Sequence, residues 1–266
     1  MNSVQQLIEI MRALRDKDSG CPWDLEQDFN SLIPYTIEES YEVADAIERN
    51  NLDDIKSELG DLLFQIVFYS QLATEQNAFD FYDVTQTISD KLIRRHPHVF
   101  ADKKVKDAAQ QTIEWEKIKQ QERKEKAGKN DTNISHLDDV SRTLPTLMRA
   151  EKLQKRAAKE GFDWPEVKGV IAKIYEELNE VQQELEAEVI NKEKLEDEIG
   201  DLFFSCINLS RYVNVDAEVS VRKANLKFEK RFRKLEKIVA AKGLQVNEMD
   251  VDELESVWRE VKTLEK

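Results

Sequence analysis

Residues that interrupt α-helices are scarce in this chain of 266 residues, which contains only 7 glycines and 5 prolines. Cysteine is rarer still, and because Cys21 and Cys206 lie far apart in the sequence, we expect no disulfide framework and a reducing compartment. The amino-terminal segment lacks the apolar core of a signal peptide, and no apolar run approaches the length of a membrane span. These absences predict a soluble, cytoplasmic protein without a membrane partner.

Positive charge is also in deficit, because 40 lysines and arginines are outnumbered by 54 aspartates and glutamates, which gives a formal net charge of −14. Such an acidic surface repels the phosphates of nucleic acids and of anionic lipids, so neither is expected as a partner. Small phosphorylated ligands are not excluded, since divalent cations bridge acidic side chains to phosphate. The abundance of Glu, Lys, Leu, Ala and Gln beside so few helix breakers predicts an all-α fold.

The two halves of the chain carry the same four landmarks in the same order. The pairs are residues 11–13 with 148–150, 38–42 with 176–180, 58–64 with 198–204, and 115–119 with 258–262. The number of residues between paired landmarks grows only from 137 to 143 along the chain, so the two copies differ by small insertions. Chance similarity between glutamate-rich helices explains such ordered matches poorly, and a tandem duplication explains them well.

The hydrophobic periodicity of each half is helical, and no period-two strand pattern persists. Helices are expected near residues 3–17, 32–49, 52–76, 81–95 and 108–126, and in the second half near 145–160, 166–189, 191–213, 216–242 and 250–265. We therefore predict two tandem all-helical domains, residues 1–120 and 144–266. A polar linker is expected over residues 121–143, because this segment contains Asn, Ser and Gly, which favour turns and loops.

Two carboxylates interrupt a strongly apolar predicted helix in each half. Glu58 and Asp61 lie within the segment ELGDLLFQIVFYSQL, and Glu198 and Asp201 repeat them. Residues at i and i+3 share a helix face, so each pair points the same way. An unpaired charge on an apolar face is very costly, and a bound cation would remove that cost.

The preceding helix supplies further acids at the same spacing, namely Glu39 and Glu42 in the first half and Glu177 and Glu180 in the second. Two antiparallel helices joined by a short turn would bring four acids together in each half. Four carboxylates without histidine or cysteine favour Mg²⁺ or Mn²⁺ over zinc. A solvated acidic face paired with lysines is the alternative, although the coupling of the two motifs, found twice, favours a metal site.

In both halves a glycine lies between the glutamate and the aspartate of the apolar helix, at Gly60 and Gly200. A glycine within a helix costs about 1 kcal/mol relative to alanine, so something is expected to approach the backbone there. A neighbouring helix and a ligand are equally good explanations.

In combination, these motifs resemble the MazG-like, all-α nucleoside triphosphate pyrophosphohydrolases. The matching segments are CPWD at 21–24, EESYE at 38–42, ELGDLLF at 58–64 and RRHPHVF at 94–100. The resemblance implies a helical-bundle fold, a homodimer, Mg²⁺ dependence and hydrolysis of nucleoside triphosphates to monophosphate and pyrophosphate. The metal ligands it implies are Glu177, Glu180, Glu198 and Asp201, with a second set at Glu39, Glu42, Glu58 and Asp61.

Other residues are candidates for contact with the substrate. Glu176 is expected either to position or deprotonate the attacking water or only to support a metal ligand. Phosphates require cations, for which the candidates are Lys194, Lys227, Lys230 and Arg231. Surface ion pairs in charge-rich helices explain the same four residues equally well.

Trp258 and Lys262 are four residues apart on the last predicted helix, so an indole and an ammonium group share one face. Together they could stack on a base and reach a polar edge or a phosphate. A tryptophan on an amphipathic helix is more often part of the core. No residue pattern selects one base, so we expect broad specificity over ribo- and deoxyribonucleotides.

The basic helix distinguishes the two halves. In the first half, Ser89 occupies the position of Asn225 and Pro97 ends the helix just past Arg95. The second half is therefore expected to be the main catalytic unit, and the first a weaker site or a dimerisation and regulatory copy. Two alternatives to a broad enzyme that clears unwanted nucleotides stay open: an enzyme selective for one dNTP or for phosphoribosyl-ATP, and a non-catalytic helical adaptor.

Overall fold

The computed structural model describes residues 2–101, 107, 110–111, 114–115, 117–119, 121–122, 135–138 and 140–264. Over these residues the regular structure consists of α-helices and one short 3-10 turn, so the predicted all-α fold is confirmed. No helix in this part of the chain is long and apolar enough to cross a membrane. The chain divides into two compact units, residues 1–129 and 130–266. Most of the predicted linker lies outside the described residues, and so does most of the helix expected near 108–126.

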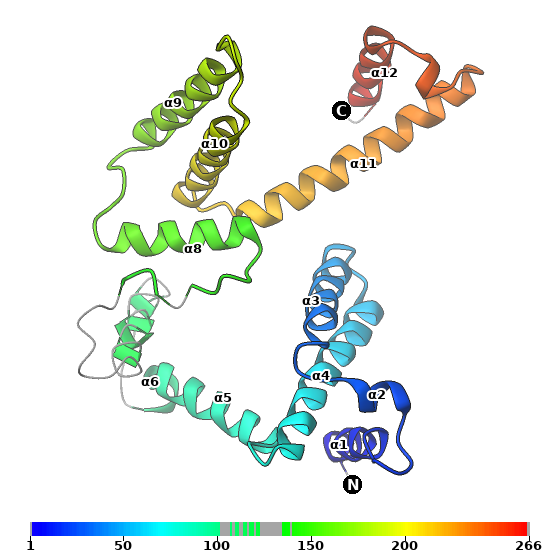
Figure 1. The fold of residues 1–266 in the computed structure, drawn as a ribbon, viewed down its shortest axis with the longest axis vertical. Helices are drawn as coiled ribbons and strands as arrows, with labels where there is room; N and C mark the ends of the chain where they lie inside the picture. The colour runs from blue at the N-terminus through cyan, green and yellow to red at the C-terminus, as the bar shows by residue number, and fades with distance from the viewer. Residues whose placement is uncertain are drawn as a thin grey trace. The chain divides into compact units, whose positions relative to one another are not determined.

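Six helices are described in the first unit (Figure 1). They are α1 (Ser3–Leu14), α2 (Pro22–Glu26), α3 (Ile33–Glu48), α4 (Leu52–Glu75), α5 (Phe81–Arg95) and α6 (Pro97–Phe100). The short helix α2 was not expected, and it forms at the CPWD segment with proline in its first turn. Helix α5 ends immediately before His96-Pro97, as the proline predicts.

The pairing of α3 with α4 depends on two consecutive asparagines. Asn50 takes a positive φ of 53°, a conformation that asparagine tolerates better than most residues, and so ends α3. Asn51 then caps α4, because its side chain accepts hydrogen bonds from the backbone N–H groups of Asp53 and Asp54. The turn is therefore short, and α3 and α4 lie side by side as an antiparallel pair.

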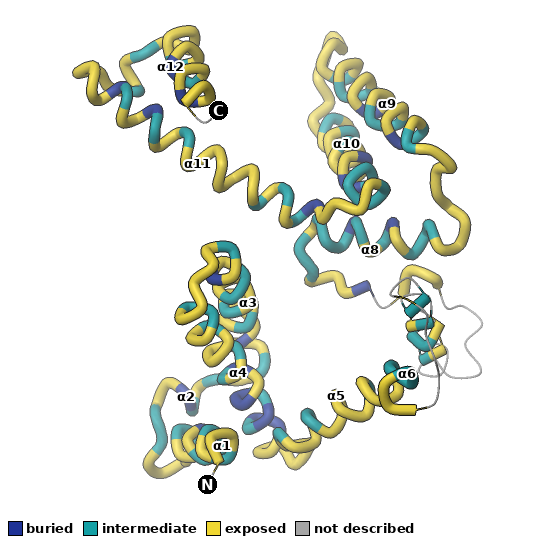
Figure 2. Tube along the Cα trace, turned by 180° about the vertical axis from the view of Figure 1, so that it is seen from behind, coloured by how far each residue is buried: buried dark blue, intermediate teal, exposed yellow. Residues whose placement is uncertain are grey.

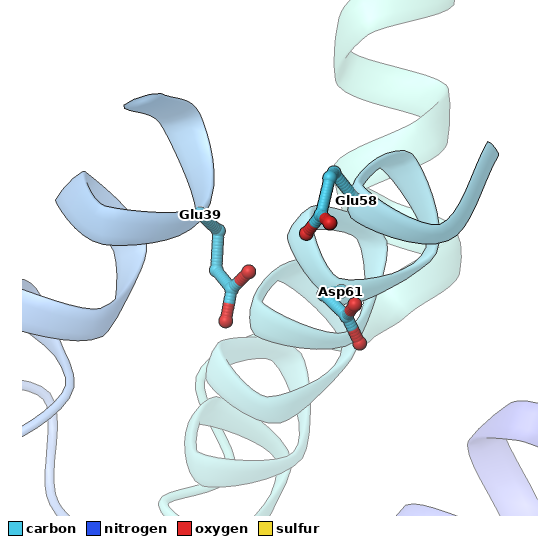
Figure 3. Close-up of side chains that lie close together, drawn as sticks. All are labelled: Glu39, Glu58 and Asp61. Carbon is cyan, nitrogen blue, oxygen red and sulfur yellow. The ribbon is translucent and has the colours of Figure 1, made fainter. Parts of the chain in front are cut away.

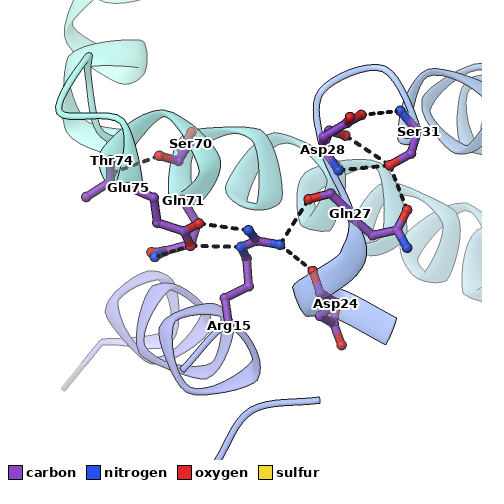
Figure 4. Close-up of polar contacts among 9 residues, drawn as sticks. All are labelled: Arg15, Asp24, Gln27, Asp28, Ser31, Ser70, Gln71, Thr74 and Glu75. Carbon is purple, nitrogen blue, oxygen red and sulfur yellow. Dashed lines mark hydrogen bonds and ion pairs between the residues drawn. The ribbon is translucent and has the colours of Figure 1, made fainter. Parts of the chain in front are cut away.

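The core of the first unit lies where α1 packs against α4, around Met11 and Phe68, which are both fully buried (Figure 2). Arg15 extends this contact (Figure 4), because its guanidinium donates to both carboxylate oxygens of Glu75, at 2.8 and 2.7 Å. The same group donates to the backbone carbonyls of Asp24 and Gln27. One buried cation thus joins the end of α1, the segment at α2 and the end of α4.

The second unit repeats the helical pair and adds a long helix. Its elements are α8 (Thr146–Lys159), α9 (Val167–Glu186), α10 (Lys192–Tyr212), α11 (Ala217–Ala241), the 3-10 turn η1 (Val246–Glu248) and α12 (Val251–Thr263). Helices α9 and α10 lie side by side, and α8 crosses their base (Figure 1). Helix α11 leaves this group near its own first turn and packs at its far end against α12.

Candidate metal and nucleotide site

Three of the predicted acids converge in the first unit (Figure 3). Glu39 projects from α3 toward α4, which carries Glu58 and Asp61. One carboxylate oxygen from each lies within 4.8 Å of the other two. The i, i+3 spacing on α4 and the short turn before it are sufficient to produce this group.

The electrostatics of this group are unfavourable without a cation. The pKa of Glu39 is raised, first by burial and then by the charges of Asp61, Glu42 and Glu58. Burial likewise raises the pKa of Glu58, followed by the charge of Glu42. Glu42 is thus close enough to repel both residues, although it lies outside the group of three.

The second unit repeats the arrangement with Glu177 and Glu180 on α9 and Glu198 on α10, whose oxygens also lie within 4.8 Å of one another. Glu177 is buried, with 3% of its surface exposed. One of its oxygens accepts an ion pair from Lys173 at 2.7 Å, and the other, Oε2, is buried without a hydrogen-bond partner in the described part of the chain. The pKa of Glu180 is raised, first by burial and then by the neighbouring carboxylate of Glu177.

Asp201, the fourth predicted ligand of the second unit, is exposed and lies outside this group of three. It follows Glu198 by three residues, so it lies on the neighbouring part of the same face of α10. Each unit therefore brings together three of its four predicted acids and leaves one beside them: Glu42 in the first unit, Asp201 in the second.

The other predicted residues near the acids are occupied by ion pairs. The carboxylate of Glu176 is largely exposed and accepts from Lys173 at 2.8 Å. Lys194 is exposed and lies 3.8 Å from Glu184. Sequence reasoning missed Lys173, which bridges Glu176 and Glu177. Its position four residues before Glu177 is the signal that would have indicated it.

In the part of the second unit that the structure describes, Lys227 and Lys230 of α11 lie apart from the acids. Lys227 and Lys230 are exposed on an open surface together with Leu226 and Lys234. Beyond its first turns, α11 runs away from the α9–α10 pair (Figure 1). The charges that contribute most to the pKa shift of Glu180 come from Glu177, Glu198 and Lys173, which lie on α9 and α10.

Trp258 is half-buried and packs against the apolar cluster between α11 and α12, with its ring centroid 5.5 Å from that of Phe228. The Lys262 ammonium lies 5.8 Å from the indole centroid. In the first unit, the matching Lys119 ammonium lies 4.5 Å from the Trp115 ring centroid, although Trp115 is exposed. The structural role of Trp258 is thus observed, and its contact with a base stays a prediction.

Comparison with known proteins identifies the family. The model of the MazG nucleotide pyrophosphohydrolase domain matches residues 27–100, which include all four predicted acids of the first unit. The chain is 51% identical to a nucleoside triphosphate pyrophosphohydrolase of Escherichia coli K12, over 100% of this chain and 99% of that protein. It is 42% identical to the nucleoside triphosphate pyrophosphohydrolase/pyrophosphatase MazG of Thermotoga maritima, over 97% and 95%. It is also 39% identical to the uncharacterized protein YabN of Bacillus subtilis, over 97% of this chain and 51% of that protein. The chain therefore belongs to the MazG family of nucleotide pyrophosphohydrolases.

Proposed function

We propose that this enzyme hydrolyses nucleoside triphosphates, ribo- and deoxyribonucleotides alike, to the monophosphate and pyrophosphate, and thereby clears unwanted nucleotides. Mg²⁺ is its proposed cofactor, with Mn²⁺ able to replace it. The second unit is the proposed main catalytic unit. The observation that carries this is Glu177, a buried carboxylate within a group of three acids whose Oε2 has no hydrogen-bond partner in the described part of the chain.

The residues fit a hard divalent cation. An unpartnered buried carboxylate oxygen is costly, and a cation is the partner that removes the repulsion shown by the raised pKa of Glu180. The ligand set contains only oxygen, which suits Mg²⁺ or Mn²⁺. Open space lies beside Gly200, where an added Cβ would meet no atom within 4 Å. No described helix of the same chain packs on this glycine, so a ligand has room to approach the backbone there.

Glu177, Glu180 and Glu198, with Asp201 beside them, are the proposed ligands, and Glu39, Glu42, Glu58 and Asp61 form the second set. When bound, Mg²⁺ supplies positive charge that offsets the charge of the phosphates as it develops. Glu176 is the proposed residue that orients the attacking water or accepts its proton, with support of a metal ligand as the alternative role. Lys173 forms ion pairs with both Glu176 and Glu177.

Phosphate binding is proposed for Lys194, Lys227, Lys230 and Arg231, and base or phosphate contact for Trp258 and Lys262. Because α11 leaves the acids of its own chain, a second copy is the proposed source of Lys227, Lys230 and Arg231, in a homodimer. The exposed apolar side chains of α11 support this, since Leu226 and Phe228 are 49% and 59% exposed.

The decisive experiment measures pyrophosphate release from a panel of ribo- and deoxyribonucleoside triphosphates with Mg²⁺. Wild type is compared with the Glu39→Ala/Glu42→Ala and Glu177→Ala/Glu180→Ala variants. We expect turnover of every nucleotide and its loss only in the second variant. Loss only in the first would reverse the assignment of the units. Strong preference for one nucleotide would contradict broad specificity. Absence of turnover in folded, Mg²⁺-bound wild type would instead support the alternative of a non-catalytic helical adaptor.

A further inference from the structure

A pocket in the second unit is lined by two arginines and by none of the predicted site residues. It lies beside the first half of α8 and encloses about 470 Å³. Its apolar wall includes Leu153 and Phe204, and its polar groups come from Arg142, Thr146 and Arg149. The volume falls within the range of roughly 300–1,000 Å³ typical of pockets that bind small molecules.

The cations of this pocket have no acid beside them. Arg149 is half-buried, and its Nε is buried without a hydrogen-bond partner in the described part of the chain. Glu151, the acid that follows it on α8, is paired with Lys155 at 2.6 Å. Arg142 is exposed at the same pocket, and no acidic residue is found among the described residues that line it. Two guanidinium groups therefore share the pocket without a carboxylate to neutralise them.

The first unit carries a neutralised network at the matching positions. An offset of 137 residues pairs Arg142, Thr146 and Arg149 with Gln5, Glu9 and Arg12. Arg12 donates to both carboxylate oxygens of Glu9, at 2.8 and 2.9 Å, and Gln5 donates to the same carboxylate at 3.0 Å. In the second unit threonine replaces the glutamate and arginine replaces the glutamine. The second copy has thus lost the acid and gained a second cation.

A phosphate group is the anion that this arrangement fits. Guanidinium groups bind phosphate oxygens through paired, charge-assisted hydrogen bonds, and the Thr146 hydroxyl is a further donor. Burying the Nε of Arg149 without a partner costs free energy, which an anion in the pocket would recover. Such a site binds its anion without a divalent cation, whereas the acids on α9 and α10 repel phosphate unless a cation is bound.

The pocket is separate from the group of acids. Helix α9 contributes no residue to its described lining, and α10 contributes Phe204. Phe204 follows Glu198 by six residues, which places it about 9 Å farther along α10 and about 120° around the helix axis. An apolar cavity beside Asn208 shares Leu153 and Phe204 with this pocket, but neither Arg142 nor Arg149 lines that cavity.

We propose that the pocket lined by Arg142 and Arg149 binds the phosphate group of a small ligand, at a site additional to the acids. The two guanidinium groups hold the phosphate, and any apolar part of the ligand lies against Leu153 and Phe204. Inorganic phosphates and phosphate esters both offer this group. The apolar wall favours an ester with an aromatic or aliphatic body, because the ester buries apolar surface that inorganic phosphate lacks.

The test measures anion binding by the full-length protein in EDTA, where no divalent cation can hold phosphate at the acids. Calorimetric titration uses inorganic phosphate, inorganic pyrophosphate and phenyl phosphate as probes. Arg142→Gln and Arg149→Gln remove one cation each. Arg12→Gln is the matched control, because its guanidinium occupies the same position in the repeat and is held by Glu9. Lys230→Gln reports any binding at the exposed lysines of α11.

We expect wild type to bind the probes, phenyl phosphate more tightly than inorganic phosphate. Arg142→Gln and Arg149→Gln should each weaken binding by about tenfold or more, since hydrogen bonds between charged groups are the strong ones. Arg12→Gln and Lys230→Gln should bind as wild type does. Tighter binding of the inorganic probes would identify inorganic phosphate as the ligand of the same site. Absence of binding to wild type, or loss of binding in Lys230→Gln alone, would overturn the proposal.

Two further measurements separate this site from the acids and from misfolding of a variant. The KM of nucleoside triphosphates with Mg²⁺ should be the same in Arg149→Gln as in wild type. A rise of KM as large as the loss of probe affinity would make the pocket part of the substrate site and overturn an additional one.

Chemical modification of wild type needs no variant. Phenylglyoxal modifies arginines in EDTA with and without phenyl phosphate, and mass spectrometry locates the modified residues. We expect the probe to protect Arg142 and not Arg12, and equal modification of Arg142 in both samples would contradict the site. Because neither binding nor protection requires turnover, an absence of triphosphate hydrolysis would refute the proposed activity and leave this inference standing.

Discussion

At the scale of single residues, burial distinguishes acids that the sequence makes equivalent. Glu39 and Glu177 occupy matching positions in the repeat, yet Glu39 is half-buried and Glu177 is 3% exposed. Lys173 neutralises only one oxygen of Glu177. The other oxygen has no hydrogen-bond partner in the described residues, so the second unit has the stronger need for a bound cation.

Glu177→Gln is therefore expected to lower kcat by about 100-fold or more and to weaken Mg²⁺ binding, because a neutral amide replaces a charged ligand. Its stability without Mg²⁺ should change little, since the loss of the ion pair with Lys173 opposes the gain from removing one repelling charge. Calorimetric titration with Mg²⁺, steady-state kinetics and thermal unfolding measure the three effects. Glu186→Gln, on the same helix but outside the acid group, is the control. Normal Mg²⁺ affinity in Glu177→Gln would exclude this residue as a ligand.

Glu122 supports a pH prediction for the first unit. Arg95 first and then Arg94 lower its pKa from 4.5 to about 2, through hydrogen bonds at 2.5 and 2.6 Å. Because the folded pKa is below the unfolded one, this carboxylate contributes stability above about pH 4.5 and loses that contribution as pH falls toward 2. Glu122→Gln should therefore be less stable than wild type at pH 7, and the difference should disappear in acid.

Chemical unfolding of both proteins at several pH values, followed by tryptophan fluorescence, measures this difference. NMR titration of the Glu122 carboxyl carbon reports its pKa directly. A Glu122 pKa near 4.5, or a stability difference that does not change with pH, would show that the arginines do not stabilise this carboxylate in solution.

At the scale of helices, a short turn between paired helices is what brings the acids together. Asn51 caps α4, and in the second unit Asn191 caps α10 in the same way by accepting from the N–H groups of Glu193 and Lys194. A cap satisfies backbone donors that otherwise have no partner at the start of a helix. Helices α4 and α10, which carry the paired glutamate and aspartate, thus each begin at a position that a single asparagine side chain defines.

Asn191→Ala should lower the free energy of unfolding of the second unit by about 1 kcal/mol, because Ala cannot accept these hydrogen bonds. Asn191→Asp caps equally well and should leave stability close to wild type. Urea unfolding followed by tryptophan fluorescence measures both changes. Equal loss of stability in the two variants would mean that something other than the cap is disturbed.

At the scale of the whole molecule, the second unit exposes apolar side chains on α11 that are not covered within the described unit. Leu226 and Phe228 lie on the segment that carries the proposed phosphate-binding residues Lys227 and Lys230. A second copy that covers this surface would both bury the apolar side chains and bring the cations to a site.

We expect sedimentation to show a dimer for the full-length protein at micromolar concentration. Leu226→Glu should shift the protein toward monomer and lower turnover together, because it places a charge in the contact. Lys237→Gln, a change of an exposed residue farther along α11, should alter neither. A wild-type monomer with full turnover would contradict the proposal that a second copy completes the site.

The sequence by itself determined the all-α fold, the ends of most helices and the convergence of the acids. These features depend on local rules: the periodicity of apolar residues, the proline and asparagine residues that end or begin helices, and the i, i+3 spacing of carboxylates. Helix α5 ends before Pro97 and α4 begins after Asn51, as those rules predict. The short helix α2 was missed because the five residues Pro22–Glu26 are too few to show a period.

Only the tertiary structure decided what surrounds the acids. It buried Glu177 beside Lys173, packed Trp258 against Phe228, and left open space beside Gly200. Matching positions of the repeat became a filled core at Phe68 and a pocket at Asn208. Such outcomes depend on how α8, α10 and the loop between α8 and α9 fit against one another. Contacts between residues distant in sequence determine that fit, and the local pattern of the chain does not encode them.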